Sequence, residues 1–307
     1  MRHDHRHGPD HASSHAPASF GSAFAIATAL NVALVVVQVI YGLAANSLAL
    51  LADAGHNLGD CLGLMLAWGA YVLGRRQPTA RFTYGFGSAS ILSALVNAGT
   101  LLVATGAIAW EAIRRLDNPG EVAGGTVIVV AAAGIAVNGI SAWLLMAGRK
   151  GDLNIRGAFL HLAADAGVSA AVVIAGVVIL LTGWTLVDPI ASLVVSAAIL
   201  WSSWTLLRES FRLSLGGVPS GVDPEEVRAF LGALPGVAST HDLHIWAMST
   251  TATALTCHLV MPGGHPGDAF LASACRELEH RFAISHATLQ IEIGDADLCR
   301  LEPVHVV

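Results

Sequence analysis

The chain has 307 residues, of which 54% are hydrophobic and only 12% are charged. An ordinary soluble domain carries roughly 25% charged residues, so the composition excludes a purely soluble protein and indicates a membrane protein. The net charge is −6, and the sequence has no basic patch or nucleic-acid-binding motif, so nucleic acid is not an expected partner.

Residues 1–19 form a polar tail with few apolar side chains, which we expect to be disordered and cytoplasmic. The tail carries five histidines: His3, His5, His7, His11 and His15. Histidine-rich tracts can collect transition metals loosely. The alternative interpretation is a solvated tail without a specific role.

Six apolar segments follow the tail, and each is long enough to cross a bilayer, which takes about 20 residues. They cover about 20–44, 48–73, 87–115, 122–147, 157–182 and 186–208. We therefore predict a transmembrane domain of six helices over residues 20–210.

Positive charges lie unevenly between these segments. The turns after the first and fifth segments carry no Lys or Arg, whereas the regions after the second, fourth and sixth do. Those basic residues are Arg75, Arg76, Arg81, Arg149, Lys150, Arg156, Arg208 and Arg212. The positive-inside bias then predicts a multi-pass protein of the cell (inner) membrane with both termini cytoplasmic. Arg114 and Arg115 oppose this topology, because it places them outside.

The second and fifth segments each contain a histidine followed four residues later by an aspartate. The pairs are His56 with Asp60, and His161 with Asp165. An aspartate at membrane depth costs roughly 2.5–3.5 kcal/mol on insertion scales, so such residues usually face a bundle interior and mark an ion pathway. Residues four apart share one face of a helix, so each pair converges on one point.

If the two helices touch, the two pairs supply two imidazole nitrogens and two carboxylates around one ion. This tetrahedral donor set suits zinc, and two carboxylates balance its charge. Calcium or magnesium would prefer more oxygen ligands. The alternative is that each histidine is a core residue and each aspartate braces a neighbouring helix, but the second copy of the motif favours a metal site.

Two further polar residues lie close to the first pair. Asp53 is one turn before His56, where it could orient a ligand or cap the start of the helix. Asn57 is expected to form a hydrogen bond to a neighbouring helix, or to lie just outside the ligands. Gly55, Gly59 and Gly63 recur every four residues, and we expect this small-residue face to have a plain packing role. Close helix packing there would permit the two ligand-bearing helices to approach one ion.

The last ninety residues read as a soluble domain, which we place at 217–295, before a short tail at 296–307. Asp223-Pro224 marks the start of a helix to about Leu234. Extended segments at 237–246 and 251–261, a helix at 267–282 and a strand at 288–293 complete an αββαβ order. Regular alternation along the first strand places His241 and His244 on opposite faces, so only one of them can share a site with His258.

Four cysteines, Cys61, Cys257, Cys275 and Cys299, lack CxxC spacing. They predict neither a disulfide framework nor a cysteine zinc ribbon. Cys257 alternates away from His258, so we expect it in the core.

Five stretches carry a resemblance that covers nearly all of the chain beyond the tail. They are Ser47–Asp60, Arg81–Gly87, His161–Asp165, Asp188–Ser192 and His241–Trp246. With these motifs the chain resembles the cation diffusion facilitators, a family of divalent-metal/proton antiporters. The resemblance implies six transmembrane helices, a ferredoxin-like cytoplasmic domain, a homodimer and zinc efflux driven by proton entry, and not an enzyme. Within the family, histidine at the position of His56 accompanies a preference for zinc.

The resemblance also implies a cytoplasmic metal site at His241, His258, His286 and Glu292, where zinc would be structural or regulatory. Cys299 and His305 could join a site across the dimer. The chain departs from the family in two places. Ser88-Ala89-Ser90 replaces the usual Arg-Ala-Glu, and the loop at 74–84 lacks the Asp and His of a second site that some members have, so none is expected there.

The chemistry of the ligands suggests proton coupling, because metal binding needs neutral imidazole and ionised carboxylate, so protons and metal compete for the same groups. Alternating access would then convert a proton gradient into metal export. Three alternatives stay open: efflux of cobalt, cadmium, nickel or iron, an intramembrane metalloenzyme, and a metal sensor. The sequence has no HExxH or GxSxG motif to support an enzyme.

Overall fold

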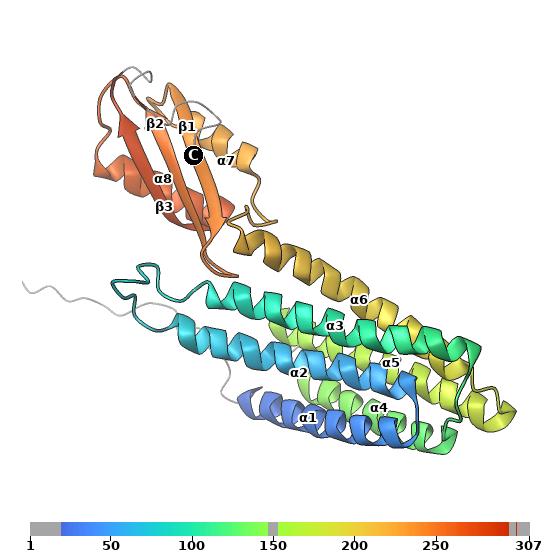
Figure 1. Cartoon of the computed structure of the whole chain (residues 1–307). Helices are drawn as coiled ribbons and strands as arrows, with labels where there is room; N and C mark the ends of the chain where they lie inside the picture. The colour runs from blue at the N-terminus through green and yellow to red at the C-terminus, as the bar shows by residue number, and fades with distance from the viewer. Residues whose placement is uncertain (1–19, 147–152, 295–298, 300–307) are drawn as a thin grey trace, which may run out of the picture. The chain divides into compact units, whose positions relative to one another are not determined.

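The computed structural model describes residues 20–146, 153–294 and 299, and the histidine-rich tail, Arg149, Lys150 and His305 lie outside them. Six long helices come first (Figure 1): α1 (Phe20–Ala44), α2 (Leu48–Gly74), α3 (Ala89–Asp117), α4 (Gly124–Met146), α5 (Leu153–Thr182) and α6 (Val187–Ser214). Each predicted apolar segment is therefore helical, and α6 continues further than predicted, to Ser214.

Within the described residues, four helices are long and apolar enough to cross a membrane: α3, the Gly124–Trp143 part of α4, the Phe159–Thr182 part of α5, and α6. The described apolar part of α1, Thr28–Ala44, is shorter. In α2 the apolar character is interrupted by four polar side chains: Asp53, His56, Asn57 and Asp60. The chain thus has a membrane helical domain, and the residues that make α2 less apolar are the candidate ligands and their neighbours.

The chain divides into two compact units by its internal contacts. The first comprises residues 1–57 and 112–192, and the second comprises residues 58–111 and 193–307. In the first unit, α4 packs along α5 and α1. A small apolar core joins the end of α1 and the start of α2 to α4 and α5: Ala45, Ala49, Leu50, Val127, Val130, Ala131 and Val172.

The start of α2 is held by an aspartate from the first turn of α6. The Asp188 carboxylate accepts hydrogen bonds from the backbone N–H of Leu48 at 2.7 Å and of Ala49 at 3.3 Å, and from the Ser47 hydroxyl. Ser47 Oγ accepts from the N–H of Leu50 at 3.2 Å. The first N–H groups of a helix lack partners in their own helix, and an anion is favoured there. These contacts fix the N-terminal end of α2, and His56 lies about two helical turns after it.

In the second unit, the glycine face of α2 packs on α3. A Cβ built on Gly59 would lie 2.9 Å from Leu101 Cγ, and one on Gly63 would lie 3.0 Å from Asn97 Nδ2. The predicted packing role of these two glycines is confirmed, but they serve the contact with α3 and not an approach of the two ligand-bearing helices. The sequence spacing shows that a helix comes close but not which one.

The C-terminal part has the predicted αββαβ order: α7 (Pro224–Gly232), β1 (Ser239–Ala247), β2 (Thr253–Val260), α8 (Asp268–Phe282) and β3 (Ile284–Glu292). The sheet order is β1-β2-β3, with β1 antiparallel and β3 parallel to β2, so α8 is the crossover that a parallel pair requires. As predicted, Asp223 caps α7 by accepting from the N–H of Glu225 at 2.9 Å, and Pro224 follows it.

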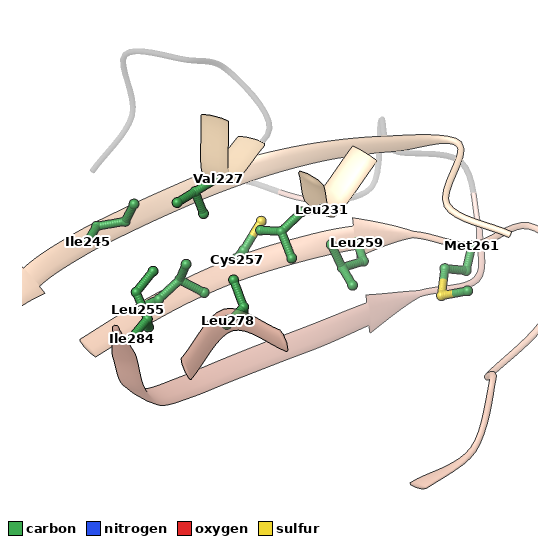
Figure 2. Close-up of a cluster of buried hydrophobic side chains, with 9 residues drawn as sticks. All are labelled: Val227, Leu231, Ile245, Leu255, Cys257, Leu259, Met261, Leu278 and Ile284. Atoms are coloured by element: carbon green, nitrogen blue, oxygen red, sulfur yellow. The ribbon is translucent and has the colours of Figure 1, made fainter. Parts of the chain in front are cut away.

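Both helices of this part cover one face of the sheet. Val227 and Leu231 of α7 and Leu278 of α8 pack on the odd-numbered residues of β2, among them Leu255, Cys257 and Leu259 (Figure 2). Cys257 is in the core, as predicted. β3 begins four residues earlier than predicted, because Ala283 adopts a left-handed φ of 55° that ends α8, so that Ile284 enters the core directly.

β1 is not a regular strand. Between the pairs His241 with His258 and His244 with Thr256, β1 contains two residues and β2 only Cys257, which makes a β-bulge. The extra residue brings His241 and His244 to the same face of the sheet, so the predicted placement on opposite faces was wrong. This face is the one opposite α7 and α8, and it carries His258.

Candidate metal centres

The first candidate centre joins α2 and α5. His56 Nε2 lies 3.0 Å from Asp165 Oδ1, and His161 Nε2 lies 3.7 Å from Asp165 Oδ2. The two imidazole rings are 6.0 Å apart and meet edge to face. Asp165 is buried, whereas about half of the His161 side chain is exposed. Two of the four predicted ligands therefore lie within a few ångströms of a third, the Asp165 carboxylate, although α2 and α5 are far apart in the sequence.

Asp60 lies on α2, one helical turn after His56, and is partly buried. Residues four apart lie on one face of a helix, so its carboxylate is on the side of α2 that carries the His56 imidazole.

Asp53 does not cap α2, because Ser47 and Asp188 fill that position. It is fully buried, and its Oδ2 accepts hydrogen bonds from Gln38 Nε2 at 2.6 Å and from Ser169 Oγ at 3.0 Å. Asn57 Nδ2 donates to Gln38 Oε1 at 3.2 Å and to the Asp53 carbonyl at 3.1 Å. The predicted hydrogen bond from Asn57 to a neighbouring helix is confirmed, and the network ties α1 and α5 to the turn of α2 before His56.

Sequence reasoning missed Gln38 and Ser169. The available signal was Gln38 itself, which is one of two amides, with Asn31, in the apolar run of the first segment. Ser169 gave none, because serine is common in helices that pack closely in membranes.

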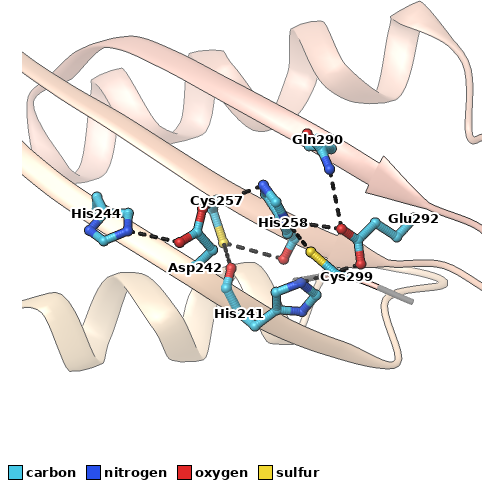
Figure 3. A network of polar contacts seen from close by, with 8 residues as sticks. All are labelled: His241, Asp242, His244, Cys257, His258, Gln290, Glu292 and Cys299. Carbon is cyan, nitrogen blue, oxygen red and sulfur yellow. Dashed lines mark hydrogen bonds and ion pairs between the residues drawn. The ribbon is translucent and has the colours of Figure 1, made fainter. Parts of the chain in front are cut away.

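The second candidate centre lies on the open face of the sheet (Figure 3). Ligand atoms of four side chains lie within 4.8 Å of one another: His241, His258, Glu292 and Cys299. His258 Nδ1 is 2.9 Å from Glu292 Oε1 and 3.5 Å from Cys299 Sγ, and His241 Nε2 is 3.3 Å from Glu292 Oε2. The His241 and His258 rings meet edge to face at 5.0 Å.

The donors in this cluster fit zinc. Two imidazole nitrogens, one carboxylate oxygen and one sulfur make a four-atom set of the kind that zinc binds tetrahedrally. His241 Nε2 is buried and makes no hydrogen bond among the described residues, and its neighbour at 3.3 Å is the Glu292 carboxylate of the cluster. Burial by itself would raise the pKa of Glu292, but the Cys299 thiol and the nearby His241 outweigh it and hold that pKa below its usual value. Glu292 is therefore an ionised carboxylate at neutral pH, which is the form that can bind a metal.

His286 is not brought to this cluster. It is exposed on β3, opposite Ala254 of β2, and its ring meets the ring of Tyr84 at 5.4 Å. Within one chain the fourth side chain of the cluster is Cys299, which the sequence suggested only for a site across a dimer. Cys299 follows β3 by seven residues, and no periodic pattern predicts where such a residue returns to the sheet.

Cys257, one residue from His258, has a different character. Its side chain points into the core, and its Sγ donates to the carbonyls of His241 at 3.6 Å and His258 at 3.5 Å. Burial raises the pKa of this thiol to about 12. It is therefore a neutral core side chain and not a fifth ligand.

Comparison with known proteins places both parts of the chain in one family. Residues 24–213 match the cation efflux transmembrane domain, and residues 219–293 match the cytoplasmic domain of cation efflux proteins. The chain therefore belongs to the cation efflux family, whose members are membrane transporters and not enzymes.

Similar proteins include two named transporters. The zinc transporter ZitB of Escherichia coli is 40% identical over 258 residues, which are 83% of this chain and 82% of that protein. The cadmium, cobalt and zinc/H(+)-K(+) antiporter of Bacillus subtilis is 34% identical over 261 residues, which are 83% of this chain and 84% of that protein. The solved metal-bound C-terminal domain of the CzcD transporter from Cupriavidus metallidurans shares 40% sequence identity over 23% of this chain and 99% of its own, with a TM-score of 0.22. A TM-score this low carries no argument about the fold.

Proposed function

We propose that this protein exports zinc from the cytoplasm in exchange for protons. The observation that carries the proposal is the 3.0 Å contact of His56 with Asp165, with His161 beside the same carboxylate. Two imidazoles on one buried aspartate are a donor set that favours zinc over harder ions such as magnesium. The zinc transporter named among the similar proteins supports the same cargo.

The transport site in this proposal has four ligands: His56, Asp60, His161 and Asp165. We include Asp60 because it lies one helical turn from His56 on the same face of α2. Asp53 and Asn57 act outside the ligands by fixing the turn of α2 that carries His56, through Gln38 and Ser169.

Proton exchange follows from the same groups. Zinc needs neutral imidazole and ionised carboxylate, so a proton that binds to either competes with the metal. A site that opens alternately to the two sides of the membrane loads zinc on the less acidic side and protons on the more acidic side. The antiporter from Bacillus subtilis supports this coupling, and its name makes cadmium and cobalt the alternative cargoes.

In the proposed architecture all six long helices span the cell (inner) membrane, with both termini in the cytoplasm. The αββαβ part is a ferredoxin-like cytoplasmic domain through which two copies of the chain form a homodimer. Its cluster holds a structural or regulatory zinc through His241, His258, Glu292 and Cys299, with Cys299 in the place that the family resemblance gave to His286.

Growth of a zinc-sensitive bacterial host tests the proposed cargo and site. The unaltered protein should restore growth on zinc, whereas Asp165→Asn and His161→Ala should not, at equal amounts in the membrane. The matched control is Asp117→Asn, which makes the same change at an exposed position at the end of α3. Growth of Asp165→Asn cells equal to that of the control would contradict the proposal.

A further inference from the structure

Asp242 adopts a strained backbone conformation next to the cytoplasmic cluster. Its φ is 49°, in the left-handed region, and it lies in the bulge of β1. Such a conformation is unfavourable for a non-glycine residue and persists where the surrounding structure imposes it, often at functional sites. Aspartate tolerates it better than most residues.

The bulge directs the Asp242 carboxylate between two imidazoles (Figure 3). Its Oδ1 accepts a hydrogen bond from His244 Nε2 at 2.8 Å, and its Oδ2 lies 3.5 Å from His258 Nε2. The other ring nitrogen of His258, Nδ1, faces Glu292 and Cys299. His258 is thus bracketed, with an acidic group at Nε2 and the candidate metal position at Nδ1.

A histidine that binds a metal usually donates its second ring N–H to a carboxylate, which fixes the tautomer and ring orientation and makes the ligand more basic. We propose that Asp242 is the positioning residue for His258. It holds the proton on Nε2, so that the Nδ1 lone pair is directed at the metal, and the contact shortens when metal binds. His244, which is partly exposed, fixes the Asp242 carboxylate in turn.

This inference rests on the proposed cytoplasmic zinc site. It explains the bulge and the left-handed φ of Asp242, which the four ligands by themselves do not require. The bulge makes room for Asp242 beside a strand that would otherwise pair regularly, and the left-handed φ turns its carboxylate towards His258. Glu292 also has a partner outside the four ligand atoms, because Gln290 Nε2 donates to its Oε1 at 3.2 Å.

Cobalt binding to the full-length protein in detergent tests the proposal. A thiolate–cobalt charge-transfer band reports the cytoplasmic site alone, since the proposed transport site has no thiol, and loss of the band in Cys299→Ser assigns it. Displacement of cobalt by zinc then gives the zinc affinity. We expect Asp242→Asn to weaken zinc binding roughly 10–100-fold while the band at saturation stays the same. His244→Ala should weaken it less.

The control is Asp268→Asn, the same change at an exposed position on α8, which should leave the affinity unchanged. The melting temperature of the metal-free protein separates positioning from loosened packing, and we expect it to be the same in Asp242→Asn and the control. Zinc affinity of Asp242→Asn equal to the control, or weakened only in step with a lower melting temperature, would overturn the inference alone. A wild-type protein without the band would remove the cytoplasmic site and the inference together.

Discussion

His56 and Asp165 are 109 positions apart in the chain, and their side chains meet at 3.0 Å. One residue is on α2 and the other on α5, so this contact joins the two helices that carry the HxxxD motifs. The imidazole on α2 is one of the two nitrogen donors of this site, and the other is His161 on α5.

Replacing that imidazole should change the metal preference of the transport site. In His56→Asp a nitrogen donor becomes an oxygen donor, which suits harder cations better than zinc. We expect zinc affinity relative to manganese to fall by about tenfold, which corresponds to about 1.4 kcal/mol. Competition of the two metals for uptake into everted membrane vesicles measures the ratio. An unchanged ratio would mean that His56 does not bind the transported ion.

Asp188→Ala should destabilise the transmembrane part. The substitution removes the acceptor for the N–H groups of Leu48 and Ala49 and for the Ser47 hydroxyl. Loss of a helix cap costs about 1–2 kcal/mol, so the free energy of unfolding should fall by that amount. Thermal unfolding in detergent, followed by tryptophan fluorescence, measures the change. Asp117→Ala, at an exposed aspartate, should not alter the transition, and an equal effect of both would argue against the cap.

The glycine face of α2 can be tested with two identical substitutions. Gly59→Ala places a Cβ against the Leu101 side chain and should cost on the order of 1–3 kcal/mol. Gly69→Ala, on the same helix, meets no atom within 4 Å and should be neutral or stabilising by up to about 1 kcal/mol, as expected from helix propensity. Melting temperatures of the two variants compare them directly. If Gly59→Ala is as stable as Gly69→Ala, the close packing of α2 on α3 is wrong.

Thiol reactivity should separate the cysteines of the cytoplasmic part. Burial raises the pKa of Cys257 to about 12. A raised thiol pKa means less thiolate at any given pH, so at pH 9 its thiolate fraction is about one thousandth and iodoacetamide should not label it in the folded protein. Cys299 should react in metal-free protein and become protected when zinc is added.

Mass spectrometry of the labelled peptides follows each cysteine separately. Cys275, which is partly exposed on α8, is the internal control and should react equally with and without zinc. Zinc that leaves the labelling rate of Cys299 unchanged would exclude Cys299 as a ligand.

The helices and the HxxxD pairs could be predicted from the sequence because the information is local. An i, i+4 spacing fixes which side chains share a helix face, and long apolar runs mark the helices before any packing is known. The contact of His56 with Asp165 then needs only that α2 and α5 touch. The partner of Gly59 could not be predicted in the same way, because a close-packing face does not specify the helix that fills it.

The cytoplasmic cluster was less predictable for a related reason. His241 and His258 face each other through strand pairing. The alternation pattern left His241 and His244 as alternatives, and the family resemblance favoured His241. The bulge at Asp242 depends on a left-handed φ that tertiary contacts impose, and the HDLH sequence reads equally well as a regular strand. Cys299 lies beyond the last strand, so its position depends on how the chain returns and not on a repeat.

Zinc flux in proteoliposomes under an imposed pH gradient tests the central claim most directly. With the purified protein, protons that move down their gradient should drive zinc across the membrane in the opposite direction. The protons should appear on the side that zinc leaves. His161→Ala and Asp60→Asn should show neither movement, while Asp117→Asn should match the unaltered protein. A zinc flux that does not depend on the pH gradient, or that persists in both ligand variants, would contradict the account.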